Sequence, residues 1–413
     1  MTDLEVRGVK ESEWPSFFET VRVAFGTLPA AGDDAPEKRA WPIQRAWAAF
    51  DEGRAVGCAG AYEFDLTLPG RTTAPAAGVT WVGVRPTHRR RGALTGIMRA
   101  QLADCHARGE ALAILLASES VIYGRFGYGL ATTQSDFELD RRHARLADGP
   151  FEAPGRVRLE TDEDTIGRLL REVHDRVRRT QTGDVSRPEG WWKAFFAGGR
   201  GGPDHGPRFH LFYEDEAGVV QGFAYYRIRA GSGRPLAQDW AVLLQGLGAL
   251  TPDAYLALWQ FVWDVDLSGS VLAGLRPPDE PLRLLLADPR RLATTRSIDF
   301  LWCRMVDVPA ALAARRYAIE GSVVLEVRDP FCPWNDGRWR LDGGPAGASC
   351  VRADGASADL TLSAAELGAA YLGGTRLAAL AAARRVDEHT PGALARADLL
   401  FAEARAPWCQ TFF

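Results

Sequence analysis

Lysine is almost absent from the sequence. Of its 49 basic residues only three are lysines, at Lys10, Lys38 and Lys193. A GC-rich genome is the simplest cause, although a protein that handles acyl donors would also gain from having few nucleophilic surface amines. The scarcity of lysine alone therefore assigns no function.

Long apolar runs and paired cysteines are also absent. No run approaches the about 18 apolar residues that a membrane-spanning helix needs. The first residues, MTDLEVRGVKESEW, are charged rather than signal-like. The six cysteines are scattered without a CxxC pair, which argues against a zinc site or a disulfide framework. We therefore expect a cytoplasmic protein with no metal and no membrane partner.

The composition also excludes an excess of positive charge. A net charge of −4 and a pI of about 6.0 do not suit a general nucleic-acid binder. A hydrophobic content of 46% and a charged content of 25% are those of an ordinary globular protein. The 413 residues are enough for roughly two to four domains.

Two segments follow the same plan. Residues 46–66, AWAAFDEGRAVGCAGAYEFDL, alternate apolar and polar side chains on both sides of a glycine-containing turn. Residues 208–228, RFHLFYEDEAGVVQGFAYYRI, do the same. Each segment is typical of a β-hairpin. The repeat predicts a duplicated α/β unit, with copies at 1–150 and 151–302.

A third region has a different pattern. Residues 321–342 predict two strands around a turn rich in Pro, Asn, Asp and Gly. A further strand follows, and then a helix that starts with a capping box of Ser363 and Glu366. Residues 303–413 are therefore expected to form an α+β domain.

A basic loop joins an apolar strand to an amphipathic helix in residues 79–109. Four arginines, Arg85 and Arg89–Arg91, surround His88, and Gly92 follows them. The N–H groups at a helix start bind phosphate, arginine forks add charge, and a glycine permits close approach. The alternative is a solvated charge cluster. Gly83, in the preceding strand, predicts a bulge where a ligand can approach the backbone.

The second copy lacks this loop. Its residues 237–266 predict a strand and a helix with no arginine–glycine turn between them. Only the first copy is therefore expected to bind a phosphate group.

The segments around the loop resemble a known family. A strand at 111–118 leads into ESVIYGRFGYG, residues 119–129. Strand, arginine–glycine loop, helix, strand and a Phe-Gly-Tyr turn resemble the acyl-CoA core of GCN5-related N-acetyltransferases (GNAT). With VRPTHRRRG and the aromatic end APWCQTFF, the chain is similar to the enhanced intracellular survival (Eis) branch. The resemblance implies an active GNAT domain, a degenerate second copy and a sterol-carrier-like third domain.

The resemblance also implies an acetyl-CoA site. Strand residues would pair their backbone with the pantetheine arm, loop residues would hold the pyrophosphate, and two later residues would lie along the cofactor. The strand residues are Val82, Gly83 and Val84, and the residues along the cofactor are Ser118 and Glu119. The loop residues are Arg90, Arg91, Gly92, Ala93, Leu94 and Thr95. Leu94 departs from the Gly or Ala that the motif prefers at its position.

Tyr123 is the candidate general acid. A phenol with a pKa near 10 can protonate a thiolate whose conjugate acid has a pKa near 8.5. Tyr128, in the same turn, is the competing tyrosine, and a merely packed aromatic is the alternative.

The general base is implied by the resemblance to be the C-terminal carboxylate, here that of Phe413. Trp408, Phe412 and Phe413 crowd the end of the sequence and should prefer burial, which would raise the pKa of the carboxylate. The alternative is a tail that closes the third domain.

The acceptor implied by the resemblance is a primary amine, such as an aminoglycoside modified at one or more amino groups, and the implied assembly is a hexamer. Trp81 could form an aromatic wall. Five carboxylates could form acidic walls: Asp33, Asp34, Glu63, Asp65 and Glu403. Phe412 stands where an acid would help to hold a polycation, which favours a smaller or less charged amine. A lipid or sterol carrier and a non-catalytic acyl-CoA sensor remain alternatives, although a carrier has no need of the arginine loop.

Overall fold

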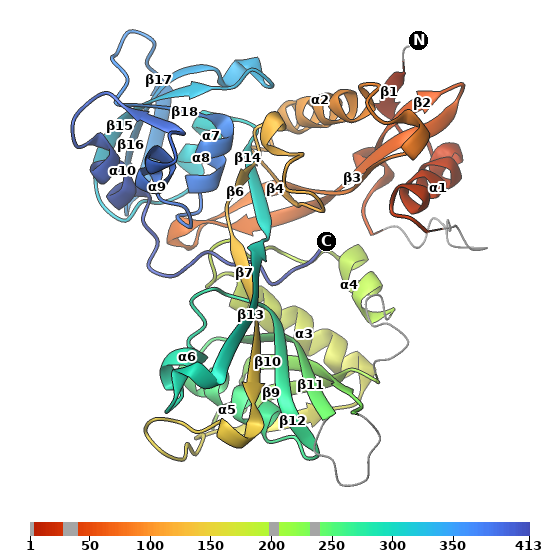
Figure 1. The fold of residues 1–413 in the computed structure, drawn as a ribbon, viewed down its shortest axis with the longest axis vertical. Coiled ribbons are helices and arrows are strands. Elements are labelled where there is room, and N and C mark those ends of the chain that lie inside the picture. The colour runs from red at the N-terminus through yellow and green to blue at the C-terminus, as the bar shows by residue number, and fades with distance from the viewer. Residues whose placement is uncertain (1–3, 28–39, 198–205, 232–239) are drawn as a thin grey trace.

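The computed structural model describes residues 4–27, 40–197, 206–231 and 240–413. Within them it forms three β-sheets with helices packed against them, in units that meet near the middle of the molecule (Figure 1). The predicted class, two α/β units and an α+β domain, is confirmed. In these ranges no helix is both long and apolar enough to cross a membrane.

The first sheet combines N-terminal strands with one strand from much later in the chain. In spatial order they are β1 (Glu5–Gly8), β2 (Trp47–Asp51), β3 (Arg54–Thr67), β4 (Thr73–Val84), β5 (Leu112–Leu116), β14 (Leu301–Met305) and β6 (Gly129–Leu130). Helices α1 (Trp14–Ala24) and α2 (Ala93–Ala107) contact this sheet. β2 and β3 form the hairpin predicted at residues 46–66. Among the described strands of this sheet, β4 and β5 are the only parallel pair.

The second sheet repeats that order. Its strands are β8 (Arg156–Glu160), β9 (Phe209–Glu214), β10 (Val220–Arg229), β11 (Trp240–Ala249), β12 (Ser268–Arg276), β7 (Thr133–Asp140) and β13 (Leu292–Asp299). Its helices are α3 (Glu163–Arg178), α4 (Glu189–Phe196), α5 (Pro252–Trp263) and α6 (Leu282–Leu285). β9 and β10 form the second predicted hairpin, and β11 with β12 is again the parallel pair. The predicted duplication is confirmed.

Each sheet takes one strand from the other half of the chain. β7 follows β6 but inserts between β12 and β13, and β14 follows β13 but inserts between β5 and β6. The two crossings lie side by side, because the N–H of Leu301 donates to Thr132 Oγ1 and the N–H of Phe300 donates to the Thr132 carbonyl. In Figure 1 both crossings run vertically between the upper and lower units. The two copies are therefore interlocked.

This exchange corrects the predicted domain limits. Residues 133–140 fall inside the predicted first domain, 1–150, but belong to the second sheet. Residues 301–305 straddle the predicted limit between 151–302 and 303–413, but complete the first sheet. Strand composition carries no signal for which of two similar sheets a strand joins, so the sequence could not show the exchange.

The third unit is an α+β domain, as predicted. Its sheet runs β17 (Gly347–Arg352), β16 (Gly337–Gly344), β15 (Gly321–Arg328), β18 (Leu360–Ser363) and β19 (Val386–Glu388). Its helices are α7 (Val308–Ala314), α8 (Ala364–Ala370), α9 (Leu377–Ala382) and α10 (Ala393–Phe401). The capping box of Ser363 and Glu366 is present at the start of α8.

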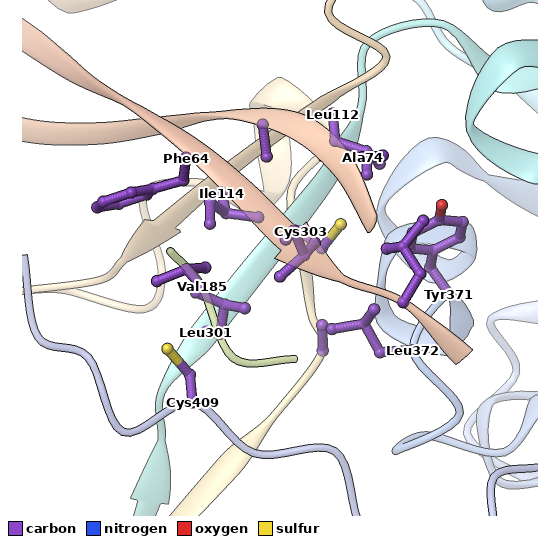
Figure 2. Packing of buried hydrophobic residues seen from close by; sticks show 14 of the residues in the cluster. Phe64, Ala74, Leu112, Ile114, Val185, Leu301, Cys303, Tyr371, Leu372 and Cys409 are labelled. Atoms are coloured by element: carbon purple, nitrogen blue, oxygen red, sulfur yellow. The ribbon is translucent and has the colours of Figure 1, made fainter. Parts of the chain in front are cut away.

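One hydrophobic cluster connects all three units. In the view of Figure 2, Cys303 of β14 lies between Ile114 of β5 and Tyr371, which follows α8 in the third unit. Val185, after α3, and Cys409, near the chain end, belong to the same cluster. Burial of a large apolar side chain contributes about 1.5–3 kcal/mol, so this shared cluster fixes the units relative to one another.

Candidate active site

The parallel pair of the first sheet opens at its end. β4 and β5 pair only as far as Val79 and Leu115. Beyond Val79, β4 bulges: Cys58 pairs with Gly83 and Gly60 with Thr80, so β4 has one more residue in this interval than β3. The predicted bulge is confirmed. Beyond Val79, the backbone of β4 that faces β5 has no partner strand among the described residues. It can therefore pair with an extended ligand.

Gly83 also has a packing role within the fold. A Cβ on Gly83 would lie 2.6 Å from Ala24 Cβ of α1. The close approach of α1 to the sheet is therefore sufficient by itself to require a glycine at this position.

The basic loop leads directly into α2. Gly92 has a φ of 87°, a left-handed conformation that favours glycine, and no side chain caps the helix. The first-turn N–H groups of α2 thus have no capping side chain and can bind an anion. Arg89 and Arg90 are exposed beside them, and neither forms an ion pair with a described carboxylate.

The other basic side chains of the loop pair with carboxylates of the protein itself. Asp51 Oδ2 lies 3.1 Å from Arg91 Nη1 and 3.2 Å from His88 Nε2. Arg85 pairs with Glu19 of α1 at 3.1 Å. The loop is therefore held against β2 and α1, and two arginines remain free to bind a phosphate group.

A cavity of about 800 Å³ lies beside the diverging strands. Four predicted site residues line it: Val82, Ser118, Tyr123 and Phe413. Their positions in the sequence span more than 300 residues, from β4 to the end of the chain. We call this space the first cavity.

Tyr123 is buried at the wall of the first cavity, with 4% of its surface exposed. Burial, reinforced by the charge of Glu119, raises the pKa of its phenol to about 12. The phenol therefore stays protonated and can donate. Tyr128 is fully buried and is not among the residues that line the first cavity, which favours Tyr123 as the acid.

The end of the chain is held inside the molecule. Trp408 and Phe413 are 5% and 7% exposed, whereas Phe412 is 44% exposed. The Phe413 ring packs edge-on against Phe64, with 4.9 Å between ring centroids. Burial of the terminal aromatics is thus confirmed for two of the three.

Residues 182–191 hold this tail, which we define as residues 402–413. The fully buried carboxylate of Asp184 accepts from Gln410 Nε2 at 3.0 Å and from Thr411 Oγ1 at 3.3 Å. Arg187 Nε donates to Thr411 Oγ1 at 3.0 Å, and Trp191 Nε1 donates to the Phe412 carbonyl at 2.9 Å. None of these partners belongs to the third unit. The tail also packs against that unit, because a Cβ on Gly373 would lie 2.9 Å from Glu403 and one on Gly374 would lie 2.8 Å from Pro407.

The remaining predicted residues lie in different places. Gly83, Val84, the 90–95 loop and Glu119 are outside the lining of the first cavity, and Glu119 is exposed. Trp81 lines the cavity, as expected of an aromatic wall.

The acidic candidates are not gathered at this cavity. Glu63 and Asp65 are exposed on β3, and Glu403 accepts a hydrogen bond from Thr182. Asp33 and Asp34 lie outside the described residues.

Sequence reasoning missed several residues of the cavity wall. Asp136 of β7 and Asp299 of β13 both line it, although these strands belong to the second sheet. Trp302 Nε1 donates to Asp299 at 2.8 Å, and Arg296 lies 3.9 Å from Asp136. A carboxylate on an alternating strand gives no local signal of its role. No group of three or more potential metal ligands occurs in the described part of the chain.

Family models match most of the chain. Residues 5–131 and 183–305 match two models described as an acetyltransferase (GNAT) domain. Residues 308–410 match a sterol carrier protein domain.

Full-length relatives identify the family. The chain is 42% identical over 411 residues to an uncharacterized N-acetyltransferase of Streptomyces coelicolor, covering 98% of each chain. It is 36% identical over 408 residues to the N-acetyltransferase Eis of Mycobacterium tuberculosis, covering 95% of each. The chain belongs to the Eis family of N-acetyltransferases.

A solved structure of the Eis family shares the same architecture. Eis1 from Mycobacterium abscessus is 34% identical and superposes with a TM-score of 0.87, over 99% of this chain and 100% of its own. An N-acetyltransferase of Anabaena variabilis, at 17% identity and a TM-score of 0.86, shows only the fold. As a member of the Eis family, the chain is a GNAT-type N-acetyltransferase, a class that uses acetyl-CoA.

Proposed function

We propose that the chain transfers the acetyl group of acetyl-CoA to a primary amine in the first cavity. The observation that supports this most strongly is the convergence of Val82, Ser118, Tyr123 and Phe413 on one cavity. Three distant parts of the sequence meet there. They are a strand with free backbone groups, the candidate general acid Tyr123 and the end of the chain. This set matches what acetyl transfer needs.

The cofactor is proposed to bind across the opened end of the first sheet. The backbone of Val82, Gly83 and Val84 would pair with the pantetheine arm. Arg90 to Thr95 would hold the pyrophosphate at the uncapped start of α2, and Ser118 and Glu119 would lie along the cofactor. The left-handed Gly92 and the unpaired Arg90 fit this group.

Phe413 and Tyr123 are proposed to move the protons. The α-carboxylate of Phe413, the last residue of the sequence, accepts a proton from the ammonium group and releases it to solvent. The neutral amine then attacks the thioester carbonyl, so that a C–N bond forms and the C–S bond breaks. Tyr123 protonates the leaving thiolate and recovers its proton from the acetylated nitrogen.

The identity of the amine acceptor is proposed from the family resemblance and from the charges of the cavity wall. An aminoglycoside, acetylated at one or more amino groups, is the acceptor that the family resemblance implies. Asp136 and Asp299 supply negative charge to the first cavity, but Arg22 and Arg296 line it as well. This mixed lining favours an amine with few charges over a polycation.

A lipid or sterol carrier is less well supported, because it needs neither the arginine loop nor Tyr123. The hydrogen bonds of residues 410–412 go to residues 182–191 rather than to the third unit, so they do not decide against a carrier. A non-catalytic acyl-CoA sensor would keep the loop but have no use for the buried chain end. The cytoplasmic location and the hexamer stay predictions, and sedimentation analysis tests the second.

The test is thiol release from acetyl-CoA in the presence of tobramycin, spermidine, a lysine peptide or phenethylamine. Tyr123→Phe should lower kcat by about 100-fold or more, with little change in the KM for acetyl-CoA. Tyr128→Phe is the matched control and should keep the parent rate. A Tyr123→Phe variant as fast as the parent would exclude the proposed acid. Binding of acetyl-CoA without thiol release for any amine would favour the sensor.

A further inference from the structure

We propose that a second cavity binds the body of the acceptor, and that this body is aromatic and carries a carboxylate that pairs with Arg208. The assignment rests on the proposed function, because it specifies which amines that site takes. The second cavity has a volume of about 740 Å³ and lies between the chain end and the second sheet.

The two cavities adjoin each other. Asp136, Gly274, Leu275 and Phe412 line both of them. Phe412, exposed over 44% of its surface, therefore stands at their junction, one residue before the proposed base. A molecule that occupies both cavities would therefore pass these shared residues.

The walls of the second cavity are mostly aromatic and aliphatic. Rings come from three separate parts of the fold: β3, α4 and the second sheet. They are Tyr62, Phe137, Trp191, Phe195 and Tyr225. Such walls stabilise a flat apolar body through burial and edge-to-face contacts, and they give a highly hydroxylated polycation few hydrogen-bond partners.

Arg208 is the positively charged group among the residues that line this cavity. Its Cζ lies 4.0 Å from the centroid of the Phe195 ring, its Nε donates to Gln245 Oε1 at 3.3 Å, and its Nη1 donates to the Phe195 carbonyl at 3.2 Å. No described carboxylate forms an ion pair with it. Burial lowers the pKa of the Arg208 guanidinium, which marks the desolvation of an uncompensated positive charge.

A half-buried guanidinium without a counter-ion favours an anionic ligand group. Carboxylates match the fork of an arginine and form charge-assisted hydrogen bonds with it. Asp136, at the junction, provides the opposite charge for the ammonium end, although its carboxylate also accepts the Leu275 N–H at 3.2 Å and lies 3.9 Å from Arg296. The charges of the two sites thus match an amine at one end of the ligand and an acid at the other.

Equilibrium binding without acetyl-CoA tests the assignment independently of turnover. The probes are para-carboxyphenethylamine, its para-carbamoyl analogue and the corresponding phenylbutylamines, which cover two lengths. The carboxylated probe of at least one length should bind about tenfold more tightly than its carbamoyl analogue. Arg208→Gln should abolish that preference, and Arg208→Lys should keep part of it.

The matched control is Arg229→Gln, because Arg229 is an exposed arginine on β10 that does not line the cavity. It should leave the preference unchanged. Equal affinity for carboxylated and carbamoyl probes of both lengths, or a preference that survives Arg208→Gln, would overturn the assignment. Arg208-dependent binding with no acetylation of any amine would instead refute the proposed function and leave the binding site standing.

Discussion

The two copies of the repeated unit differ at the start of one helix. In the first copy α2 follows the left-handed Gly92 and has no side-chain cap. In the second copy Thr251 caps α5 by accepting the N–H of Ala254, and Pro252 in the first turn has no N–H to offer. The same fold thus leaves an anion site open in one copy and closes it in the other.

The gap between the parallel strands differs in the same way. β11 and β12 also stop pairing before their ends, at Leu244 and Ala273. There the buried Arg276 donates to the Leu247 carbonyl at 2.9 Å and pairs with Glu280 at 2.7 Å. In the second copy one of its own side chains, that of Arg276, therefore links the two diverging strands.

The second copy nevertheless contributes to the site of the first. The exchanged strand β7 brings Asp136 to the first cavity, and residues 182–191 hold the chain end beside it. The copy that lacks the features of a cofactor site therefore supports the proposed site of its neighbour.

Removal of Arg276 should have the largest effect on the second copy. Arg276→Met leaves Glu280, itself buried, without its partner, and loss of one member of a buried ion pair costs about 3–5 kcal/mol of unfolding free energy. Denaturant unfolding measures this. The double variant Arg276→Met/Glu280→Gln should recover part of the loss, and the KM for acetyl-CoA should stay unchanged in both. Stability equal to that of Arg229→Gln would contradict a structural role for the pair.

Substitution of Gly92 should affect cofactor binding in the first copy. An alanine at a φ of 87° is strained by about 1–2 kcal/mol, so Gly92→Ala should raise the KM for acetyl-CoA about tenfold. Gly218→Ala is the control, because Gly218 has a similar φ of 78° in a turn of the second copy. Steady-state kinetics should show a KM change only for Gly92→Ala. Equal changes in both variants would mean that the loop has no specific role.

Acid should weaken the second copy through His210. Burial, with a contribution from Arg208, lowers the pKa of His210 to about 4. The unfolded chain takes up that proton below about pH 6.5, so stability falls as the pH drops from about 6.5 to about 4, by up to about 1.4 kcal/mol per pH unit. His210→Phe should flatten this slope. Thermal unfolding at several pH values measures it, and an unchanged slope in His210→Phe would show that His210 is not the cause.

Short sequence patterns correctly predicted the structural features that depend on neighbouring residues. The hairpins follow from alternation around glycine turns, the capping box from Ser363 and Glu366, and the basic loop from its arginines and Gly92. Burial of the chain end follows from its aromatic residues, although Phe412 lies half-exposed between two cavities.

What the sequence did not predict depends on pairing over long distances. Residues 133–140 could pair with either of two sheets that have the same strand order, and only the folded structure shows that they join the second. The role of Asp136 follows from that choice, so it was missed. Arg208 was missed for a related reason, because the walls of its cavity come from β3, α4, the second sheet and the tail.

The position of the terminal carboxylate is the central claim, and one added residue tests it most directly. An alanine after Phe413 would move the carboxylate by up to about 3.8 Å while keeping every side chain of the tail. We expect kcat for amine acetylation to fall by about 100-fold or more, with unfolding and acetyl-CoA binding unchanged. A kcat equal to that of the parent would contradict the role of the chain end as the base.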